Sequence, residues 1–398
     1  MDHNARTNGA IAVAFAVAVF ACAAPPDRPA ESGSEPGAPF PGLESADLVR
    51  FASGKALFDR VFTPAEGLGP AFNENQCSAC HTDPASGGTG EQRVLKATRF
   101  DSVSGTCDRL EQAGGLNVRS QATPALKAAG ITRETVPREA TARGRFSPPF
   151  LFGAGLVEAI PDSVILSRED SADRDGDGIS GRAGRTADGR LARFGRKAEF
   201  ATLVEFISGA LRLEMGLTSP LEPVEARVNG RPLPRGTDPA RDPEVDSTSL
   251  NALRDYVRLL APLPPEGVSE DARDSVDQGR RLFHALRCAS CHVPAMVTGP
   301  SAVSALDRRS VSLYSDLLLH DMGGGLADIC GLTAQPSEVR TEPLAGLRYR
   351  EAFLHDGRAH TVGDAIHQHG GEARRAREAF TLRGASEQVL LLRFLETL

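Results

Sequence analysis

One five-residue pattern occurs twice in this chain, as Cys77-Ser78-Ala79-Cys80-His81 and as Cys288-Ala289-Ser290-Cys291-His292. The C-x-x-C-H pattern is typical of covalent c-type haem attachment. The two thiols can each add to a vinyl group of one porphyrin, and the His can then be the proximal ligand of the iron. A C-x-x-C pair alone would fit a zinc half-site, a redox dithiol or a disulfide, but none of these needs the His. We therefore predict two covalent haems, held by Cys77, Cys80 and His81 and by Cys288, Cys291 and His292.

The N-terminus predicts export. An apolar run over residues 10–21 is too short to span a bilayer but fits the hydrophobic region of a signal peptide. The run ends in Val19-Phe20-Ala21-Cys22, which resembles a bacterial lipobox. We predict a signal peptide over residues 1–22 with a lipid anchor on Cys22, the alternative being an ordinary signal peptide cut nearby. The expected location is the periplasm or the extracytoplasmic face of the membrane.

Two further cysteines, Cys107 and Cys330, are not used by the haem motifs or the lipobox. In an oxidising compartment they can form a disulfide between the two halves, or remain two buried thiols. The chain is 398 residues long with a formal net charge of -7, and it has no run of Lys and Arg. Nucleic acid is therefore not an expected partner.

Helical spacing of apolar residues predicts helices over Ser45–Phe62, Lys197–Leu217, Leu250–Leu263, Gln278–Leu286 and Ser386–Leu398. Residues 101–160 are expected to form loops with short helices. We predict a mainly α fold with two cytochrome c-like helical domains, each carrying one covalent haem, with long loops and an inserted segment. The expected divisions are a disordered tether over 23–42, an N-terminal haem domain with an insertion over 43–262 and a C-terminal cytochrome c domain over 266–398.

An acidic run, Asp173-Arg174-Asp175-Gly176-Asp177-Gly178, matches the opening of an EF-hand calcium loop. The closing position holds Gly184 instead of Glu. Asp173, Asp175 and Asp177 are therefore candidate calcium ligands, and a solvated acidic turn is the alternative.

The iron ligands available to the two haems differ. Between His81 and His284 the chain has no His and only one Met, Met215. The part of the chain after the second motif offers several candidates: His320, His355, His360, His367, His369, Met296 and Met322. We expect an open first haem that does chemistry and a six-coordinate second haem that relays electrons.

Peroxide cleavage at an open iron needs a group that moves a proton between the two oxygens. Without a His in this region a carboxylate is the natural candidate, because an apolar pocket raises the pKa of such a group. Glu158 and Glu214 are the two carboxylates in apolar surroundings.

Four stretches carry a family resemblance: RFGRKAEFATL (193–203), LYSDLLLHDMG (313–323), RTEPLAGLR (340–348) and FLHDGRAHTVGDAIHQHGGEA (353–373). With them the region from about 50 to 398 resembles the bacterial di-haem oxidoreductase family, a branch of the di-haem cytochrome c peroxidase superfamily. The resemblance implies His369 as the distal ligand of the second haem, with His367 as the alternative. It also implies Glu214 as the catalytic glutamate and a calcium ion between domains.

The chain departs from the superfamily in one respect. The related peroxidases use a Trp between the haems, and this branch often has an aromatic residue where Arg196 stands, but this chain has no Trp. Electrons must then pass directly, through Phe, or through one of the three tyrosines, Tyr256, Tyr314 and Tyr349. We expect an enzyme that reduces hydrogen peroxide with electrons from a small donor protein, a cytochrome c or a cupredoxin. The alternatives are a non-enzymatic electron-transfer protein and a radical-forming oxidase that modifies a partner protein.

Overall fold

The computed structural model describes Met1 and residues 28–398. The predicted lipidation site Cys22 and residues 2–22 of the predicted signal peptide lie outside this part of the chain. Within it, no helix combines the length and the apolar character needed to cross a bilayer.

The fold is mixed, so the expected mainly α architecture is wrong: helices make up 32% and strands 13% of it. The helices are α1 (Ser45–Phe58), α2 (Cys77–Cys80), α3 (Pro124–Ala128), α4 (Ala154–Ala159), α5 (Asp162–Leu166), α6 (Leu203–Ala210), α7 (Ser247–Leu259), α8 (Glu270–Ala285), α9 (Val362–Gln368), α10 (Arg374–Thr381) and α11 (Ala385–Leu395). The strands are β1 (Arg28–Pro29), β2 (Ala71–Phe72), β3 (Val94–Asp101), β4 (Thr106–Asp108), β5 (Asn117–Val118), β6 (Gln121–Ala122), β7 (Ala142–Phe146), β8 (Gly184–Arg185), β9 (Leu191–Ala192), β10 (Met296–Val297), β11 (Arg309–Val311), β12 (Leu319–Asp321) and β13 (Glu338–Arg340).

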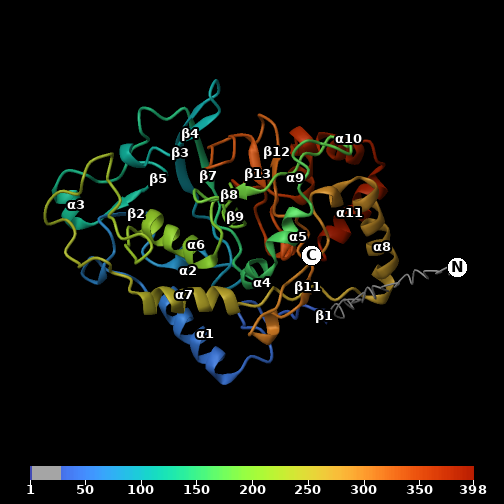
Figure 1. The fold of residues 1–398 in the computed structure, drawn as a ribbon, viewed down its shortest axis with the longest axis horizontal. Coiled ribbons are helices and arrows are strands. Elements are labelled where there is room, and N and C mark those ends of the chain that lie inside the picture. The colour runs from blue at the N-terminus through green and yellow to red at the C-terminus, as the bar shows by residue number, and fades with distance from the viewer. Residues whose placement is uncertain (2–27) are drawn as a thin grey trace.

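The largest departure from the expected fold is a four-stranded sheet that follows the first haem motif (Figure 1). Strand β3 pairs antiparallel with β4, β5 and β7, and Val94 lies opposite Phe146. The sequence of β3, VLKATRFD, has no strong alternation of apolar and polar residues, and its main partner β7 lies far along the chain. Formation of β3 depends on its pairing with strands that are distant in the sequence, and local sequence patterns do not predict such pairing.

The predicted helices around the two haem motifs are confirmed. Helix α1 packs against α7, and α8 packs against α11. Both pairs approach closely at a glycine, because a Cβ on Gly54 would lie 2.0 Å from the Ala252 carbonyl oxygen and one on Gly279 would lie 2.1 Å from the Leu390 carbonyl oxygen. Each haem motif is thus preceded by a helix held tightly to a second helix that comes later in the chain.

The helix expected over Lys197–Leu217 is shorter than predicted. It begins at Leu203, because the Thr202 side chain accepts a hydrogen bond from Glu205 N–H while the Glu205 carboxylate accepts one from Thr202 N–H, forming a capping box. After Ala210 the chain continues as a π-helical turn over Leu211–Met215. Such turns occur often at functional sites.

The two largest of the hydrophobic clusters among the described residues support the regions around the two haem motifs. The larger joins α1, α4, α6 and α7 and also includes Met296, Leu306 and Leu313. The smaller is built on α8 and α11. Chain beyond the expected boundary at 262–266 thus contributes to the larger core, and the division into two domains stays a prediction.

The expected disordered tether over 23–42 does not hold for the described part of it. Strand β1 pairs in parallel with β11, and Phe40 is buried in the larger core. Pairing and burial therefore fix these residues to the folded body, although their composition is poor in apolar residues.

Candidate active site

The first haem motif forms a single helical turn, α2, with His81 directly after it. The His81 Nδ1 atom lies 2.9 Å from the Gly88 carbonyl oxygen. A carbonyl can only accept, so Nδ1 carries the proton and Nε2 is left as a metal-ligand atom. Burial lowers the pKa of His81, which favours the neutral imidazole that a metal requires. Cys80 and His81 line a cavity, which we call the N-terminal cavity.

The second motif is built in the same way. His292 Nδ1 donates to the Tyr314 carbonyl oxygen over 3.0 Å, and burial together with neighbouring His369 lowers the pKa of His292 to about 4. Cys288, Cys291 and His292 line a second cavity, the C-terminal cavity. Within residues 28–398, none of the four motif cysteines forms a disulfide.

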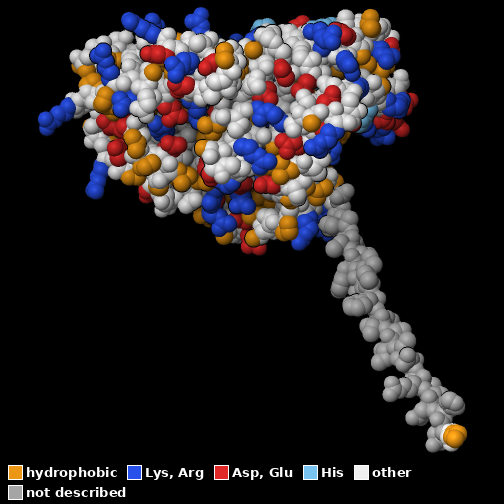
Figure 2. All heavy atoms as spheres, turned by 45° about the horizontal axis from the view of Figure 1, so that its top comes forward, with side chains coloured by type: hydrophobic (Ala, Val, Ile, Leu, Met, Phe, Trp, Pro, Cys, Tyr) orange, Lys and Arg blue, Asp and Glu red, His pale blue; other side chains and the backbone are white. Residues whose placement is uncertain are grey.

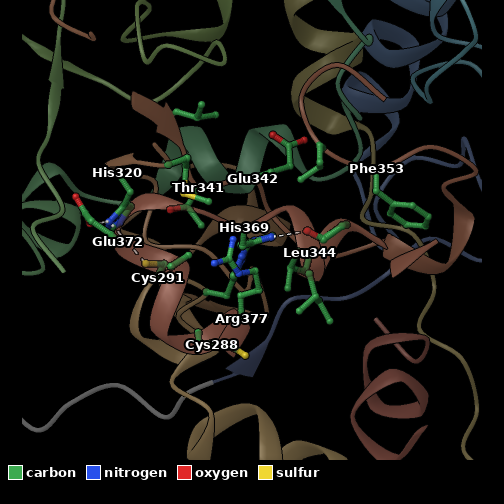
Figure 3. A pocket seen from close by; sticks show the side chains of 18 of the residues that line it. Cys288, Cys291, His320, Thr341, Glu342, Leu344, Phe353, His369, Glu372 and Arg377 are labelled. Atoms are coloured by element: carbon green, nitrogen blue, oxygen red, sulfur yellow. Dashed lines mark hydrogen bonds and ion pairs between the residues drawn. The ribbon is translucent and has the colours of Figure 1, made fainter. Parts of the chain in front are cut away.

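His369, the predicted distal ligand, lies in the C-terminal cavity (Figure 3). It faces His292, and the two ring centroids are 6.5 Å apart. Its Nδ1 donates to the Ala365 carbonyl oxygen over 2.7 Å, which again leaves Nε2 free. Two imidazoles that bind one metal from opposite sides, each with a metal–nitrogen distance of about 2 Å, have centroids roughly 6 Å apart. The pair therefore fits a bis-His iron, and the surrounding Phe283, Leu344 and Ile366 suit the apolar porphyrin.

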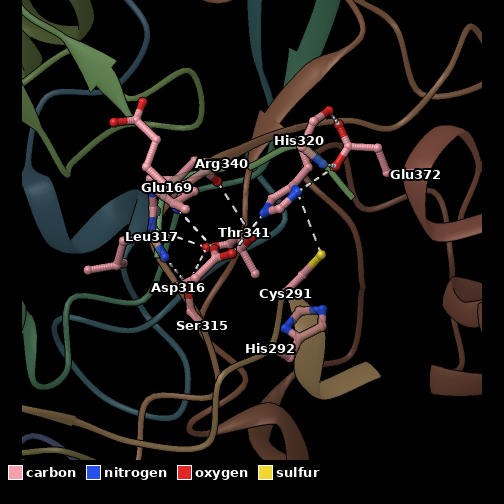
Figure 4. A network of polar contacts seen from close by, with 12 residues as sticks. Glu169, Cys291, His292, Ser315, Asp316, Leu317, His320, Arg340, Thr341 and Glu372 are labelled. Carbon is pink, nitrogen blue, oxygen red and sulfur yellow. Dashed lines mark hydrogen bonds and ion pairs between the residues drawn. The ribbon is translucent and has the colours of Figure 1, made fainter. Parts of the chain in front are cut away.

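The other candidate ligands have different contacts. His320 is buried between Asp316 (2.8 Å from Nε2) and Glu372 (2.7 Å from Nδ1), so both ring nitrogens are engaged (Figure 4). Burial alone would lower the pKa of His320, but its bonds to Asp316 and Glu372 raise it. His355 Nε2 lies 2.8 Å from Asp328.

His367, the alternative to His369, packs on Phe380 and lies outside the lining of the C-terminal cavity. His360 is exposed. Of the predicted histidines, the geometry favours His369 as the ligand.

The N-terminal cavity has a largely apolar wall with some charged side chains, among them Lys96 and Arg193, and it offers few iron ligands. Among the described residues that line it, His81 is the only His, and there is no Met. Aromatic residues form much of its wall: Phe146, Phe150, Phe152, Phe194, Phe200 and Phe206. Met215, the one Met of this region of the chain, is buried in the larger core instead. The described lining of this cavity therefore offers the iron of a porphyrin one His and no second His or Met.

Glu214 lies in the π-helical turn and lines the N-terminal cavity. Its carboxylate accepts hydrogen bonds from Asn73 Nδ2 (2.7 Å) and Asn117 Nδ2 (2.5 Å). Burial raises the pKa of Glu214, and this outweighs the opposing effects of Lys96 and the two amides. A partly buried carboxylate held in place with a raised pKa is suited to proton transfer.

Glu158, the other predicted carboxylate, is placed differently. Its Oε1 accepts from Leu203 N–H at the start of α6 over 2.9 Å, and its Oε2 lies 3.5 Å from Arg258 Nε. It is not among the residues that line the N-terminal cavity. The structure thus brings Glu214, and not Glu158, to the cavity of the first haem motif.

The predicted calcium ligands Asp173, Asp175 and Asp177 each offer a carboxylate oxygen, and these oxygens lie within 4.8 Å of one another. Asp177 forms an ion pair with Arg287, the residue before the second haem motif. The loop is thus tied to the C-terminal haem motif, and calcium binding stays a prediction.

The comparisons with known proteins identify the family. The family model described as "Di-haem oxidoreductase, putative peroxidase" matches residues 135–398. The chain belongs to this family. It is therefore an oxidoreductase enzyme, and membership implies two haems.

Solved structures add only distant similarities to this di-haem oxidoreductase. The diheme peroxidase BthA from Burkholderia thailandensis is 17% identical, with 94% of this chain and 93% of that chain covered and a TM-score of 0.43. Hydrazine synthase from Kuenenia stuttgartiensis is 12% identical, with 98% and 100% covered and a TM-score of 0.42. A MauG-like protein associated with microbial copper homeostasis is 15% identical, with 62% and 88% covered and a TM-score of 0.30. No curated protein matches the chain.

Four charged residues of this di-haem oxidoreductase were not predicted as part of a site. Arg196, Arg340, Glu342 and Arg350 line both cavities. In the sequence, Arg196 differs from the aromatic residue that the family resemblance implies at this position, but nothing marks it as part of a charged cluster. The motif stretches 193–203 and 340–348 contain three of the four, but no sequence pattern indicates that they meet.

Proposed function

We propose that this di-haem oxidoreductase reduces hydrogen peroxide to water at the N-terminal cavity, with electrons relayed through the C-terminal haem. The observation that carries the proposal is the unequal supply of ligands. His292 and His369 face each other in one cavity, whereas His81 has no second His or Met opposite it among the described residues of the other. A closed iron suits electron relay and an open one suits chemistry.

The reaction consumes one peroxide, two electrons and two protons and yields two water molecules. A haem held by Cys77, Cys80 and His81 would supply an iron at which peroxide can bind and receive the electrons. Glu214 would accept a proton from one peroxide oxygen and deliver it to the other oxygen. That second oxygen would then leave as water. Asn73 and Asn117 hold the carboxylate in place for this transfer. The phenyl rings of the wall would keep bulk water away from the reacting oxygens.

Covalent attachment of both haems through Cys77, Cys80, Cys288 and Cys291 is part of the proposal. It is supported by the positions of Cys80, Cys288 and Cys291 in the linings of the two cavities and by the lack, among the described residues, of a disulfide at any of the four cysteines. We also propose export to an extracytoplasmic compartment. The disulfide between Cys107 and Cys330 supports this, because such bonds persist mainly in oxidising compartments. The electron donor would be a small redox protein, a cytochrome c or a cupredoxin. Positive and negative side chains alternate over the face in Figure 2, so the charge pattern there does not narrow this choice.

The test is the electron paramagnetic resonance spectrum of the oxidised protein before and after hydrogen peroxide, combined with peroxide consumption in the presence of a reduced donor. We expect a high-spin signal that peroxide removes, a low-spin bis-His signal and steady turnover. Two low-spin signals indifferent to peroxide, also after half-reduction, would favour an electron-transfer protein. Peroxide-dependent spectral changes without water-producing turnover would favour an oxidase that modifies a partner.

A further inference from the structure

The two cavities share one wall. The side chains common to both linings are Arg196, Arg340, Glu342, Pro343 and Arg350, and none of them is aromatic. A group bound by these side chains would therefore lie next to both haem sites.

The charges in this wall do not balance. Glu342 is the only carboxylate of the shared set, and three guanidinium groups surround it. Arg196 forms an ion pair with Glu342 Oε2, Arg350 Nη2 lies 3.1 Å from Oε1, and Arg340 Nη2 lies 3.6 Å from Oε2. Three positive charges and one negative charge leave a surplus of two.

The surplus positive charge is carried by buried side chains. The side chains of Arg196, Arg340 and Arg350 are only 10%, 9% and 9% exposed. Burial alone would raise the pKa of Glu342, but the three guanidinium groups lower it to about 2, so this carboxylate stays charged. Isolated buried charge is costly, and such groups are normally paired.

The remaining contacts of the cluster do not supply the missing anions. Arg340 Nε donates to the Gly195 carbonyl oxygen over 2.9 Å, and Arg196 Nη2 donates to the Ser147 carbonyl oxygen over 3.3 Å. Arg350 stacks on the Phe150 ring at 4.2 Å. Among the described residues, Nε of Arg196 and Nε of Arg350 have no hydrogen-bond partner.

One other carboxylate acts on the cluster from nearby. Asp316 attracts Arg340, but its Oδ2 is already engaged by His320 (Figure 4). Asp316 thus belongs to a separate buried network, and among the described residues Glu342 remains the one carboxylate that Arg196 and Arg350 share.

We propose that Arg196, Arg340 and Arg350 form one carboxylate-binding site shared by the two haems, which takes a propionate from each, and that Glu342 holds the three guanidinium groups in position. A guanidinium group presents paired N–H donors that match a carboxylate, so two propionates would satisfy both the free donors and the surplus charge. The proposal rests on the two haems that the family implies and not on peroxide as the substrate.

The cluster would also act on both irons at once. Positive charge near an iron favours its reduced form, because reduction adds a negative charge. Loss of one arginine should therefore lower both reduction potentials, and loss of the Glu342 charge should raise both. A wall that only supports the fold would not give opposite signs.

The experiment is spectroelectrochemical titration of the purified di-haem protein, with haem content checked for each variant. Arg350→Gln should shift both midpoint potentials to more negative values, and Glu342→Gln should shift both to more positive values. Arg348→Gln is the matched control, since it comes from the same short turn but lines neither cavity. Shifts of the same sign in the two variants, or a response of only one haem, would overturn the proposal.

A charge-conserving variant covers the case in which Arg350→Gln does not incorporate two haems. Arg196→Lys keeps the charge but loses the paired donors, so the propionate bending frequencies in the resonance Raman spectra of both haems should change. Unchanged frequencies would overturn shared propionate binding. These readouts do not use peroxide, so an enzyme that shows the shifts but fails to reduce peroxide would refute the proposed function and leave this inference intact.

Discussion

His369 faces His292 across the C-terminal cavity with ring centroids 6.5 Å apart, and each ring donates from Nδ1 to a backbone carbonyl. This relationship predicts that the second haem is low-spin with two imidazole ligands. His369→Ala should remove the low-spin bis-His signal from the electron paramagnetic resonance spectrum. His367→Ala is the control and should leave the signal in place, because His367 lies outside the cavity lining. Retention of the bis-His signal in His369→Ala would show that another side chain is the ligand.

Covalent attachment predicts that both haems stay bound to the polypeptide after denaturation. The mature protein should carry the mass of two haems in denaturing mass spectrometry, because thioether bonds do not dissociate on unfolding. The double substitution of Cys77 and Cys80 by Ala should remove one haem mass and leave the other. Release of both haems from the wild-type protein by denaturant would contradict this prediction.

The proposed role of Glu214 as proton carrier predicts that its substitution slows peroxide consumption. Glu214→Gln keeps the size of the side chain but removes its ability to accept a proton. General acid–base groups contribute about 10²–10⁴-fold, so peroxide consumption should fall by roughly that factor. Glu158→Gln is the control, and its rate should stay within a few-fold of the wild type, since Glu158 lies outside the N-terminal cavity. A larger loss in Glu158→Gln than in Glu214→Gln would reverse the assignment.

The raised pKa of Glu214 also predicts a pH dependence. The carboxylate must be ionised to accept the first proton, and burial raises its pKa above the ordinary 4.5. As the pH falls through this raised value the ionised fraction decreases, so kcat/KM for peroxide should fall on the acid side. The apparent pKa of that limb should lie above 4.5. Glu214→Gln should lack the limb, and an unchanged profile in this variant would assign it to another group.

The buried position of Lys197 predicts that its substitution strongly lowers the stability of the protein. Its side chain is 1% exposed, and Nζ lies 2.7 Å from Asp328 Oδ1. Removal of one partner of a buried ion pair leaves the other charge uncompensated, so Lys197→Met should lower the free energy of unfolding by about 3–5 kcal/mol.

The control for this prediction is Lys55→Met. Lys55 forms an ion pair with Asp59 but is 42% exposed, so its removal should cost less than about 1 kcal/mol. Guanidinium unfolding of both variants makes the comparison. Equal effects would indicate that the charge on Asp328 is compensated by another group, such as His355.

Much of the local structure could be predicted from the sequence. The helices around both motifs follow from apolar spacing. His369 and Glu214 line the two cavities, and their roles as ligand and proton carrier stay predictions. The sheet built on β3 could not be predicted, because its strands pair across long separations and β3 lacks a clear alternation.

The sequence by itself determined the chemistry that lies within a few consecutive residues. Two thiols and a His in one C-x-x-C-H pattern predict a haem site wherever the chain places them, because a single turn sets their spacing. Only the tertiary structure decided which side chains from distant segments are buried together. It brought Glu214 and not Glu158 to the first cavity, and it placed Arg196 beside Glu342 in the shared wall. Burial and charge pairing between such residues depend on the packing of the whole chain, which no local pattern encodes.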